Sequence, residues 1–508
     1  MVGISYSMGI FGMEAFKVEV EADLAPGLPA FDLVGLPDTA VKESRNRVRS
    51  AMKNCGFEFP VSKITMNLAP ADLRKEGPIY DLPLLVALLK VTGQLSVNTD
   101  DSVFIGELSL NGDVRPVHGI LPMTIRAQKE GFRKIYVPAA NTREAAVVKD
   151  IEVYPVKDVF TLVEHLRGIK RLLPAEFMED YSDQFLSLPD FSDVKGQAEA
   201  KRALEIAASG NHNVLMIGPP GSGKSMLAKR IPSILPDMTF EESIQTTGIH
   251  SVAGTLTAPL IRTRPFRSPH HTISANGLSG GGTVPKPGEI SLAHNGVLFL
   301  DELPEFSRTS MEILRQPLED GEVTISRVFG TVTYPCNLRL VAAMNPCPCG
   351  YFGHPSRHCT CSPVAVNRYL SKISGPLLDR IDLHIEVPPV EYSQLASEEK
   401  AESSAEIKAR VNAARAIQVE RYKGTGITCN ANADSRMLRE YAKLSAPAKA
   451  LMEKAFEKFG FSARTYDRII KVARTIADLD ASEDIKMNHM AEAVQYRSLD
   501  RKYWRKEL

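Results

Sequence analysis

The sequence predicts an α/β protein with a parallel central sheet that carries helices on both faces. Strand-like apolar runs alternate with helical stretches between residues 191 and 392, which is the pattern of such a sheet. Residues 1–170 mix short β-rich runs with helical patterns, as expected for a separate α/β unit. Residues 393–508 are rich in Ala, Glu, Lys and Arg with apolar residues at helical spacing, which predicts a helical domain.

Length and composition narrow the class of protein. A chain of 508 residues is too long for one hydrophobic core, since cores stop growing at roughly 250–300 residues. Residues 171–190 turn polar and acidic and contain Pro174 and Pro189, so we expect a linker there. No apolar run approaches the ~20 residues needed to cross a bilayer, and the N-terminus lacks a signal-peptide pattern, which favours a cytoplasmic protein without a membrane partner. Lys plus Arg equals Asp plus Glu at 61 each, so any site for a polyanion must be local.

The apolar patterns also predict individual elements. Strands are expected at residues 15–20, 63–68, 103–110 and 134–137 of the first domain, and at 213–217, 297–300 and 338–344 of the central one. Helices are expected at residues 38–55, 226–231, 448–459 and 466–476. Two β-prone runs around a turn predict a hairpin over residues 323–334.

A glycine-rich segment at residues 218–225 has the P-loop pattern G-x-x-x-x-G-K-[ST]. It directly follows a strand-like run and precedes a helix-compatible one, a context that disfavours the alternative of a chance glycine-rich turn. In a P-loop the backbone N–H groups face the phosphates, the Lys offsets the β/γ-phosphate charge and the Ser hydroxyl ligates Mg²⁺. The expected nucleotide contacts are therefore Gly218, Pro219, Pro220, Gly221, Ser222, Gly223, Lys224 and Ser225.

An acidic pair ends the apolar run at residues 297–300. Asp301 is expected to hold Mg²⁺ together with Ser225, and Glu302 to orient and deprotonate an attacking water. The alternative is a solvated strand end without a role. An acidic pair after a short apolar strand downstream of a P-loop favours hydrolysis of the nucleotide rather than binding alone.

The order of the motifs resembles one branch of the AAA+ ATPases. After the P-loop and the acidic pair come Ala-Ala-Met-Asn-Pro at residues 342–346 and Leu-Leu-Asp-Arg-Ile-Asp at 377–382, an order similar to that of magnesium chelatases and MCM helicases. Over its whole length the chain resembles the ComM/YifB family of bacterial Mg-chelatase-like ATPases. This resemblance implies an AAA+ P-loop core over 191–392, preceded by a Lon-protease-like domain over 1–170 and followed by a helical lid over 393–508.

The same resemblance assigns roles to several polar side chains. It implies that Asn345 is a sensor residue that helps to position the water, and that Arg464 is a second sensor on the lid. Arg380 matches the arginine finger, which stabilises the transition state on a neighbouring subunit's nucleotide. Gly196 and Gln197 match a motif on the adenine side of the nucleotide. A ring of subunits with ATP and Mg²⁺ as cofactors is therefore implied.

Two of these roles have simple structural alternatives. Asn345 precedes a proline and would also fit an ordinary strand end. Arg380 stands between Asp379 and Asp382, so it would also fit a salt bridge within the chain.

Two regions suit contacts with DNA. Residues 243–288 contain no Asp or Glu but include Arg262, Arg264, Arg267 and Lys286, which predicts a local positive surface. Glycines at 277 and 280–282 favour mobile loops there, and the region resembles the pore-lining insert of this AAA+ branch. The hairpin carries Arg327 near its tip and Phe329 for base stacking, which suits a motor that does not read sequence. The alternative is a hairpin that only packs subunits together.

Four of the seven cysteines lie within residues 347–361. Cys347, Cys349, Cys359 and Cys361 form two C-x-C pairs, and four thiolates suit a tetrahedral Zn²⁺ site. This spacing is tighter than the usual C-x-x-C, so reduced loop cysteines remain the alternative. A zinc site would stiffen this insertion after the sensor strand.

Residues 1–170 resemble the Lon-protease-like domain in two stretches, 75–81 and 111–121. Lon proteases carry a nucleophilic Ser in the first stretch and an activating Lys in the second. The matching positions here are Ile79 and Leu121, which can neither attack a peptide nor accept a proton. We therefore expect a proteolytically inert platform for assembly or DNA contact.

The family resemblance implies an ATP-driven hexameric DNA motor, a helicase that promotes branch migration of recombination intermediates during natural transformation. Its expected partners are single-stranded or branched DNA without sequence preference, further copies of the chain and other recombination proteins. One alternative is a metal-chelatase-type AAA+ motor subunit that remodels a protein partner, although the chain has no D-x-S-x-S metal-adhesion motif. Another is a scaffold that binds ATP without hydrolysing it.

Overall fold

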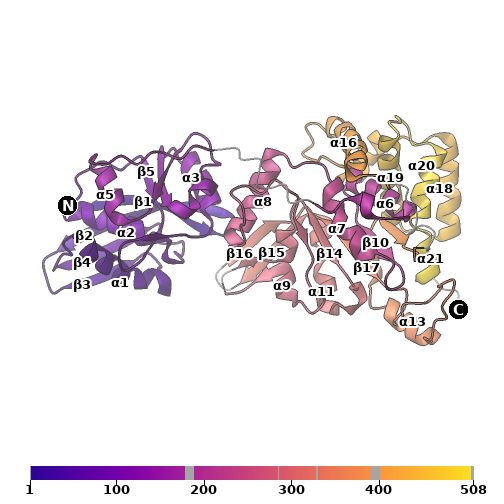
Figure 1. The fold of residues 1–508 in the computed structure, drawn as a ribbon, viewed down its shortest axis with the longest axis horizontal. Coiled ribbons are helices and arrows are strands. Elements are labelled where there is room, and N and C mark those ends of the chain that lie inside the picture. Colours follow the sequence, from indigo (N-terminus) through magenta and orange to yellow (C-terminus); the bar gives the residue numbers. More distant parts are fainter. Residues whose placement is uncertain (1, 178–187, 284, 328–329, 391–400, 505–508) are drawn as a thin grey trace. The chain divides into compact units, whose positions relative to one another are not determined.

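A computed structural model describes residues 2–177, 188–283, 285–327, 330–390 and 401–504 of the chain (Figure 1). The chain divides into two compact units. The first comprises residues 1–181, 243–261 and 330–333, and the second comprises residues 182–242, 262–329 and 334–508. In the described part of the chain, no helix combines the length and the apolar character needed to span a lipid bilayer.

The first unit is built on a seven-stranded mixed sheet with the strand order β3-β4-β2-β1-β5-β8-β9. The β1–β2 and β2–β4 pairs are antiparallel, and the other four pairs are parallel. The strands are β1 (Gly3–Phe11), β2 (Glu14–Ala25), β3 (Ala30–Val34), β4 (Lys63–Ala69), β5 (Ser102–Phe104), β8 (Lys134–Pro138) and β9 (Glu152–Val156), with β6 (Glu107–Leu108) and β7 (Val114–Arg115) in a separate hairpin. The helices are α1 (Thr39–Asn54), α2 (Asp81–Val91), α3 (Ile120–Lys129), α4 (Thr142–Ala145) and α5 (Val159–Leu166).

Local sequence explains the helices of this unit. Helix α1 begins after Asp38, whose carboxylate accepts a hydrogen bond of 2.7 Å from the Val41 N–H and so caps the first turn. Helix α2 carries a run of leucines and is buried from its first residue to Leu89, which places it at the centre of the first core. This continuous burial explains why α2 has little amphipathic pattern.

The expected strand at residues 103–110 is interrupted, so that prediction was wrong. The Gly106 N–H donates to the Ile79 carbonyl at 3.0 Å, and the Gly106 carbonyl accepts from the Leu82 N–H at 3.1 Å. Gly106 thus forms its hydrogen bonds with the chain around the start of α2, between β5, which ends at Phe104, and β6, which begins at Glu107. The pattern of apolar residues alone could not reveal this partner.

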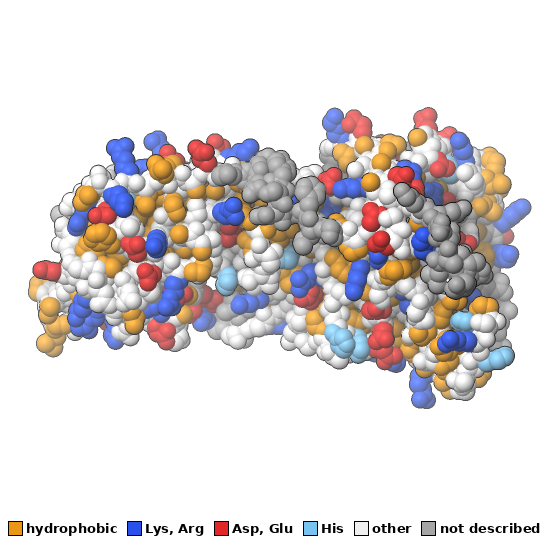
Figure 2. Space-filling view, viewed as in Figure 1, with side chains coloured by type: hydrophobic (Ala, Val, Ile, Leu, Met, Phe, Trp, Pro, Cys, Tyr) orange, Lys and Arg blue, Asp and Glu red, His pale blue; other side chains and the backbone are white. Residues whose placement is uncertain are grey.

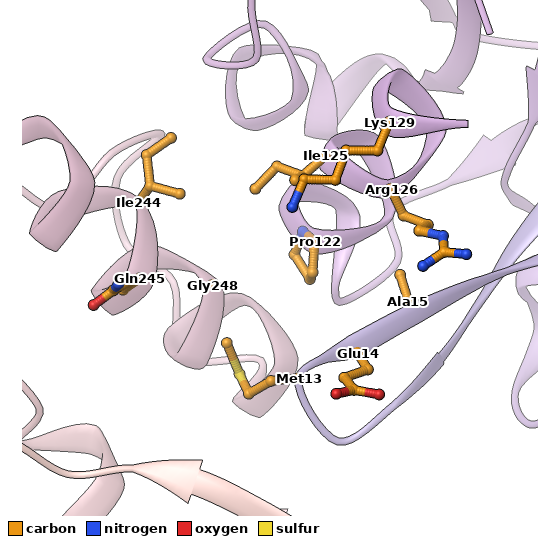
Figure 3. Close-up of a pocket in the computed structure, with 10 residues that line it drawn as sticks. All are labelled: Met13, Glu14, Ala15, Pro122, Ile125, Arg126, Lys129, Ile244, Gln245 and Gly248. Carbon is orange, nitrogen blue, oxygen red and sulfur yellow. The ribbon is translucent and has the colours of Figure 1, made fainter. Parts of the chain in front are cut away.

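Residues 243–261 belong to the first unit, although they follow the P-loop in the sequence. They include most of α8 (Phe240–Ala253). The buried Glu144 carboxylate accepts hydrogen bonds from the Ser251 hydroxyl and from the Leu121 N–H. The segment also borders a pocket of about 420 Å³, where Figure 3 shows Met13 pointing toward Gly248 of α8.

The second unit contains a five-stranded sheet with the order β11-β14-β17-β10-β18, and all of its neighbouring strands are parallel. Its strands are β10 (Val214–Ile217), β11 (Phe266–Arg267), β14 (Val297–Leu300), β17 (Arg339–Met344) and β18 (Leu383–Glu386). The residues of β10, β14 and β17 are buried throughout, as expected for a sheet covered on both faces. This parallel sheet confirms the predicted α/β class.

Helices α6 (Ala198–Gly210) and α7 (Lys224–Ile234) flank the first strand of this sheet in the sequence. Shorter elements connect the later strands. They are α9 (Ala275–Ser279), β12 (Gly280–Gly281), β13 (Lys286–Pro287), α10 (Glu289–Leu292), α11 (Arg308–Ile313), α12 (Pro317–Asp320), α13 (Pro363–Leu370) and α14 (Gly375–Leu378). The predicted hairpin is present as β15 (Glu322–Arg327) and β16 (Gly330–Pro335).

Gly280 is closely packed, although it lies in a segment for which the sequence suggested mobile loops. A Cβ on Gly280 would lie 2.3 Å from the Lys286 carbonyl oxygen, so only glycine fits between the paired β12 and β13.

The C-terminal part of the second unit is helical, as predicted. Its helices are α16 (Ser404–Arg421), α17 (Ser435–Tyr441), α18 (Ala446–Phe459), α19 (Ala463–Leu479), α20 (Met487–Gln495) and α21 (Leu499–Tyr503) (Figure 1). Ser403 and Glu406 form a capping box that starts α16. The proposed boundary between core and lid at residues 392 and 393, and residues 178–187 of the proposed linker, lie outside the described residues.

Candidate nucleotide-binding site and cysteine cluster

The P-loop connects strand β10 to helix α7. A pocket of about 400 Å³ lies over it, within the size range of small-molecule sites. Gly221 and Gly223 have φ values of +78° and +90°, a conformation that other residues rarely adopt. A Cβ on Gly218 would lie 2.2 Å from the Val387 carbonyl oxygen, so the first glycine allows a close approach. The pocket is lined by Pro220, Gly221, Ser222, Gly223, Lys224, Ser225, Met226, Asp301, Glu302, Met344 and Asn345.

Lys224 occupies the centre of this pocket. Its ammonium donates to the carbonyls of Gly218 and Pro219 at 2.8 and 2.9 Å, and to the Asn345 side-chain oxygen at 3.2 Å. Burial lowers the pKa of the Lys224 ammonium, and the carboxylates of Asp301 and Glu302 oppose that shift. A polyphosphate would supply the negative charge that this buried cation lacks.

Ser225 and Asp301 are side by side and suit a magnesium ion. The Ser225 hydroxyl donates to the Asp301 carboxylate at 2.6 Å, which brings two hard oxygen ligands to one point of the pocket. Mg²⁺ bound by these two oxygens would neutralise phosphate charge. The sheet brings these distant residues together, since α7 begins at the P-loop and Asp301 directly follows β14.

Glu302 has an unusual backbone and a partner that the sequence did not suggest. Its φ is +52°, and its side chain is half exposed at the pocket. The His271 Nδ1 atom lies 3.5 Å from a Glu302 carboxylate oxygen. His271 comes from the acid-free segment 243–288, so the carboxylate predicted to be catalytic contacts a region that is predicted to bind DNA. No local sequence pattern indicates this pair.

Asn345 and Gln197 contact the P-loop from other elements. Asn345 follows β17 and reaches Lys224 as described above. Gln197, in a left-handed conformation, donates its amide to the Ser222 carbonyl at 3.3 Å and to the Pro388 carbonyl at 2.6 Å. Gly196, with a φ of +62°, makes the turn that presents it. The Gln197 side-chain oxygen and the Ser222 hydroxyl are buried and have no hydrogen-bond partner among the described residues, so both could bind a polar ligand group beside the loop.

Arg380 and Arg464 meet at Glu319, a residue that sequence reasoning missed. Arg380 is buried, pairs with the Glu319 carboxylate and donates to the Pro376 carbonyl at 2.8 Å. The exposed Arg464 lies 3.9 Å from the other Glu319 oxygen. Among the described residues that line the P-loop pocket, neither arginine is present. Arg464 and Glu319 instead line a second cavity of about 750 Å³.

The backbone around Arg380 is tightly held. The Arg380 carbonyl accepts hydrogen bonds from Asn213 at 2.9 Å and from Arg468 at 3.1 Å. Asp382 is buried and accepts from Arg468 at 2.5 Å and from the Asn213 N–H at 2.9 Å. Arg380 thus forms its ion pair with Glu319. Asp382, the alternative partner, pairs with Arg468 instead.

The four clustered cysteines have their sulfur atoms within 4.8 Å of one another. The distances from Cys347 to Cys349 and Cys359 are 3.4 and 3.6 Å, and Cys349 lies 3.5 Å from Cys359. A tetrahedral Zn²⁺ with bonds of ~2.3 Å has S···S edges of about 3.8 Å, whereas a disulfide needs about 2.0 Å. The arrangement therefore fits metal ligation.

Backbone N–H groups favour the thiolate at one cysteine of the cluster, Cys349, whereas the pKa values of the other three cysteines are raised. The Phe352 N–H donates to the Cys347 sulfur at 3.3 Å. Burial raises the pKa of Cys349, but the backbone N–H groups of Tyr351 and Thr360 outweigh it and lower that pKa to about 6. Burial raises the pKa of Cys347. Donors to sulfur stabilise the deprotonated form that binds a metal ion.

Comparison with known proteins places the chain in a family. The family described as magnesium chelatase, subunit ChlI matches residues 190–395, subunit ChlI of Mg-chelatase matches residues 20–141, and magnesium chelatase, subunit ChlI C-terminal matches residues 401–497. Competence protein ComM of Haemophilus influenzae is 44% identical over 506 residues, which cover 98% of both chains. The uncharacterized protein YifB of Escherichia coli is also 44% identical with the same coverage. The chain belongs to the ComM/YifB family of Mg-chelatase-like proteins. Its fold is accordingly an AAA+ core with a helical lid, and the family implies ATP and Mg²⁺ as cofactors.

About a third of this ComM/YifB family member is similar to Lon protease. The Lon protease of Treponema pallidum is 28% identical over 180 residues, which are 34% of this chain and 20% of that protein. Ile79 packs in the first core, and Leu121 packs with Val147 and Leu260 in a smaller apolar cluster. The positions expected for a nucleophile and its base therefore carry buried apolar side chains.

The basic residues of the acid-free segment differ in their surroundings. Arg264 is enclosed, with hydrogen bonds to the Pro236 and Asn295 carbonyls and an ion pair with Glu242 at 2.9 Å. Arg267 forms a two-point pair with Glu289 at 2.6 and 2.7 Å. Arg262 is half-buried and Lys286 is exposed. The acids that neutralise two of the arginines stand directly outside the segment, so its absence of acids overstated its charge.

The hairpin presents Arg327 to solvent at the end of β15. Its guanidinium contacts the Ser326 carbonyl at 2.8 Å and the Asn276 side chain at 3.3 Å. Phe329 lies outside the described residues. On the face shown in Figure 2, basic and acidic side chains are interspersed, in keeping with the balanced composition.

Proposed function

We propose that this chain is an ATPase that assembles into a ring, a hexamer, and moves DNA strands through ATP hydrolysis. The observation that carries the proposal is the division of the catalytic residues. Lys224, Ser225, Asp301, Glu302 and Asn345 line one pocket. Arg380 and Arg464 lie together elsewhere, around Glu319. A complete site then needs the arginines of a second subunit.

The chemistry of the proposed hydrolysis follows from this geometry. Lys224 and the P-loop amides hold the phosphates, while Ser225 and Asp301 hold Mg²⁺, which offsets phosphate charge. Glu302 takes a proton from the attacking water, and Asn345 positions that water. The guanidinium of Arg380 from the adjacent subunit, with Arg464 beside it, stabilises charge on the transferred phosphoryl group.

We propose DNA as the polymer on which this motor acts. The similarity to a protein named for competence supports a role in natural transformation, where a branch-migration helicase would process recombination intermediates. Arg327, Phe329, Arg262 and Lys286 are the proposed contacts with single-stranded or branched DNA, independent of sequence. Arg267 would contact DNA only if its ion pair with Glu289 were replaced by one with a phosphate. Arg264 is enclosed, so its proposed role is structural. The proposed location is the cytoplasm, where ATP and DNA are available, and other recombination proteins are proposed as further partners.

The four clustered cysteines are proposed to hold Zn²⁺. Support comes from their sulfur distances, which are close to the edges of a tetrahedral site, and from the N–H donors around them. The N-terminal domain is proposed as a platform without protease activity, because Ile79 and Leu121 are apolar and buried. The division at residues 1–170, 191–392 and 393–508 remains our proposal for the domain limits.

A second candidate is a motor subunit of the metal-chelatase type that remodels a protein partner. It is favoured by the three family matches, all of which describe the ChlI subunit of magnesium chelatase. The absence of a D-x-S-x-S metal-adhesion motif in the sequence and the Lon-like front domain count against it.

The decisive test supplies the purified full-length protein with ATP, Mg²⁺ and linear, forked or four-way DNA, and follows both phosphate release and strand exchange. We expect branched DNA to stimulate ATP hydrolysis and the four-way junction to be separated into duplex products by branch migration, without cleavage. Glu302→Gln should bind ATP normally but hydrolyse it ~10²–10⁴-fold more slowly. If every DNA form leaves hydrolysis unchanged while a porphyrin-associated protein stimulates it, the chelatase-type function replaces this proposal.

A further inference from the structure

The cysteine cluster and the nucleotide pocket share one loop. Strand β17 ends at Met344, Asn345 lines the pocket, and Cys347 follows two residues later. The same loop returns to the pocket at Gly350. A Cβ built on Gly350 would lie 2.4 Å from Cδ and 2.7 Å from Cγ of Pro220 in the P-loop. The loop therefore touches the nucleotide site at two separate points.

The loop contains no regular secondary structure among its described residues, which run from the end of β17 to the start of α13. The Gly350 N–H donates to the Cys347 carbonyl at 2.9 Å, so the residue against Pro220 is tied directly to a cysteine of the cluster. A loop of this kind holds one conformation when a metal ion cross-links it and samples several when the ligands are separate thiols.

We propose that the metal bound by Cys347, Cys349, Cys359 and Cys361 holds the P-loop in its nucleotide-binding shape through the contact between Gly350 and Pro220. The proposal rests on the proposed zinc site and adds a consequence to it. ATP affinity depends on the metal, although the metal touches no part of the nucleotide. Gly350 is the positioning residue, because its φ of +84° and its contact with Pro220 leave no room for a side chain.

The first experiment measures zinc content and nucleotide affinity on the same full-length samples. Zinc is measured by mass spectrometry, and affinity by titration with a fluorescent ADP analogue. Wild-type protein should hold one zinc per chain, and Cys349→Ser/Cys361→Ser should lose it and bind the nucleotide at least about tenfold more weakly. Restored zinc in the wild type after chelation should restore the affinity.

The second experiment leaves the cysteines intact and has a matched control in the same loop. Gly350 and Gly353 have φ values of +84° and +76°, but a Cβ on Gly353 has no atom within 4 Å among the described residues. Gly350→Ala and Gly353→Ala thus share the backbone strain, and only the first crowds Pro220. We expect Gly350→Ala to keep zinc yet weaken nucleotide binding about tenfold, with Gly353→Ala close to wild type.

A shortened proline side chain provides the reciprocal test. In a Pro220→Ala background, Gly350→Ala should cost much less affinity than it does in the wild type, because the crowding is relieved. Equal affinity of Gly350→Ala and Gly353→Ala, or full affinity in zinc-free protein, overturns the inference while leaving the zinc site and the ATPase in place. Protein purified without zinc from zinc-replete cells overturns the zinc assignment itself, and the inference with it.

Discussion

The buried carboxylate of Asp382 shares its hydrogen-bond donors with the backbone of the predicted arginine finger, Arg380. Its side chain accepts hydrogen bonds from Arg468 and from the Asn213 N–H, and those two residues also hold the Arg380 carbonyl. Asp382→Asn removes the charge that Arg468 faces and places an amide group against a guanidinium. We therefore expect both a loss of stability and a displaced Arg380.

The surroundings of Asp382 determine how much stability the Asp382→Asn variant should lose. Breaking one side of a buried ion pair costs about 3–5 kcal/mol, and we take the lower end because the Arg468 side chain is 22% exposed. With a fall of ~2–4 °C per kcal/mol for large domains, a loss of ~3 kcal/mol lowers the Tm by roughly 6–12 °C. Asp379→Asn is the matched control. Its carboxylate is 37% exposed and 3.9 Å from Arg497, so its loss should cost less than about 1 kcal/mol.

Thermal unfolding of the full-length variants at two pH values measures this difference. Burial raises the pKa of Asp382, but the Arg468 cation and the hydrogen bonds outweigh it and lower the pKa below its usual value. A lowered pKa in the folded state gives stability that is present above the unfolded pKa of ~3.9 and is lost as the pH falls through the folded value. His212 lies 3.5 Å from the same carboxylate, and the ordinary pKa of a histidine is ~6.5, so the comparison is made above that value. The gap between wild type and Asp382→Asn should therefore be about equal at roughly pH 7.5 and pH 8.5. Unfolding of Asp382→Asn within 2 °C of Asp379→Asn, as a rough limit, would refute the reasoning.

Four further substitutions test the surroundings of the site. His271→Ala should reduce the stimulation of ATPase activity by DNA, because it removes the side chain that contacts Glu302. It should leave ADP affinity unchanged, because the P-loop itself is not altered. Unchanged stimulation would exclude a coupling between bound DNA and Glu302 through His271. Arg327→Ala should weaken DNA binding in a salt-dependent titration without changing the Tm. Arg264→Ala should instead lose about 3 kcal/mol of stability, because its guanidinium is enclosed. The reverse pattern would contradict the exposed position of Arg327 and the structural role of Arg264. Glu319→Gln should keep the Tm within a few degrees and should not lower kcat, since its carboxylate competes with phosphate for the predicted arginine finger; a large fall in kcat would contradict this.

Local patterns predicted the elements that local sequence determines. The buried strands β10 and β14 are continuous apolar runs, and β17 is apolar after its first residue, Arg339. Helix α18 has Pro447 in its first turn. These elements could therefore be predicted from the sequence. The P-loop and the acidic pair converge because each ends a strand of one parallel sheet, and the carboxyl ends of such strands share an edge.

Contacts between distant residues could not be predicted in this way. Glu242 and Glu289 neutralise arginines that looked unopposed, because both acids lie just beyond the ends of the acid-free segment. Glu319 meets Arg380 across 61 residues, and Gly350 meets Pro220 through a loop that has no regular pattern. Such pairs depend on the folded path of the chain, which hydrophobic periodicity does not encode.

The shared ATP site is tested most directly by mixing two inactive variants. Lys224→Ala loses phosphate binding but keeps its arginines, and Arg380→Ala keeps the P-loop but cannot assist a neighbour. If the site is built across subunits, equal mixing should restore ATPase to roughly a quarter of the wild-type rate, because random assembly pairs an intact P-loop with an intact arginine at about one interface in four. A mixture as inactive as its parts, or full activity of Arg380→Ala alone, would contradict the account.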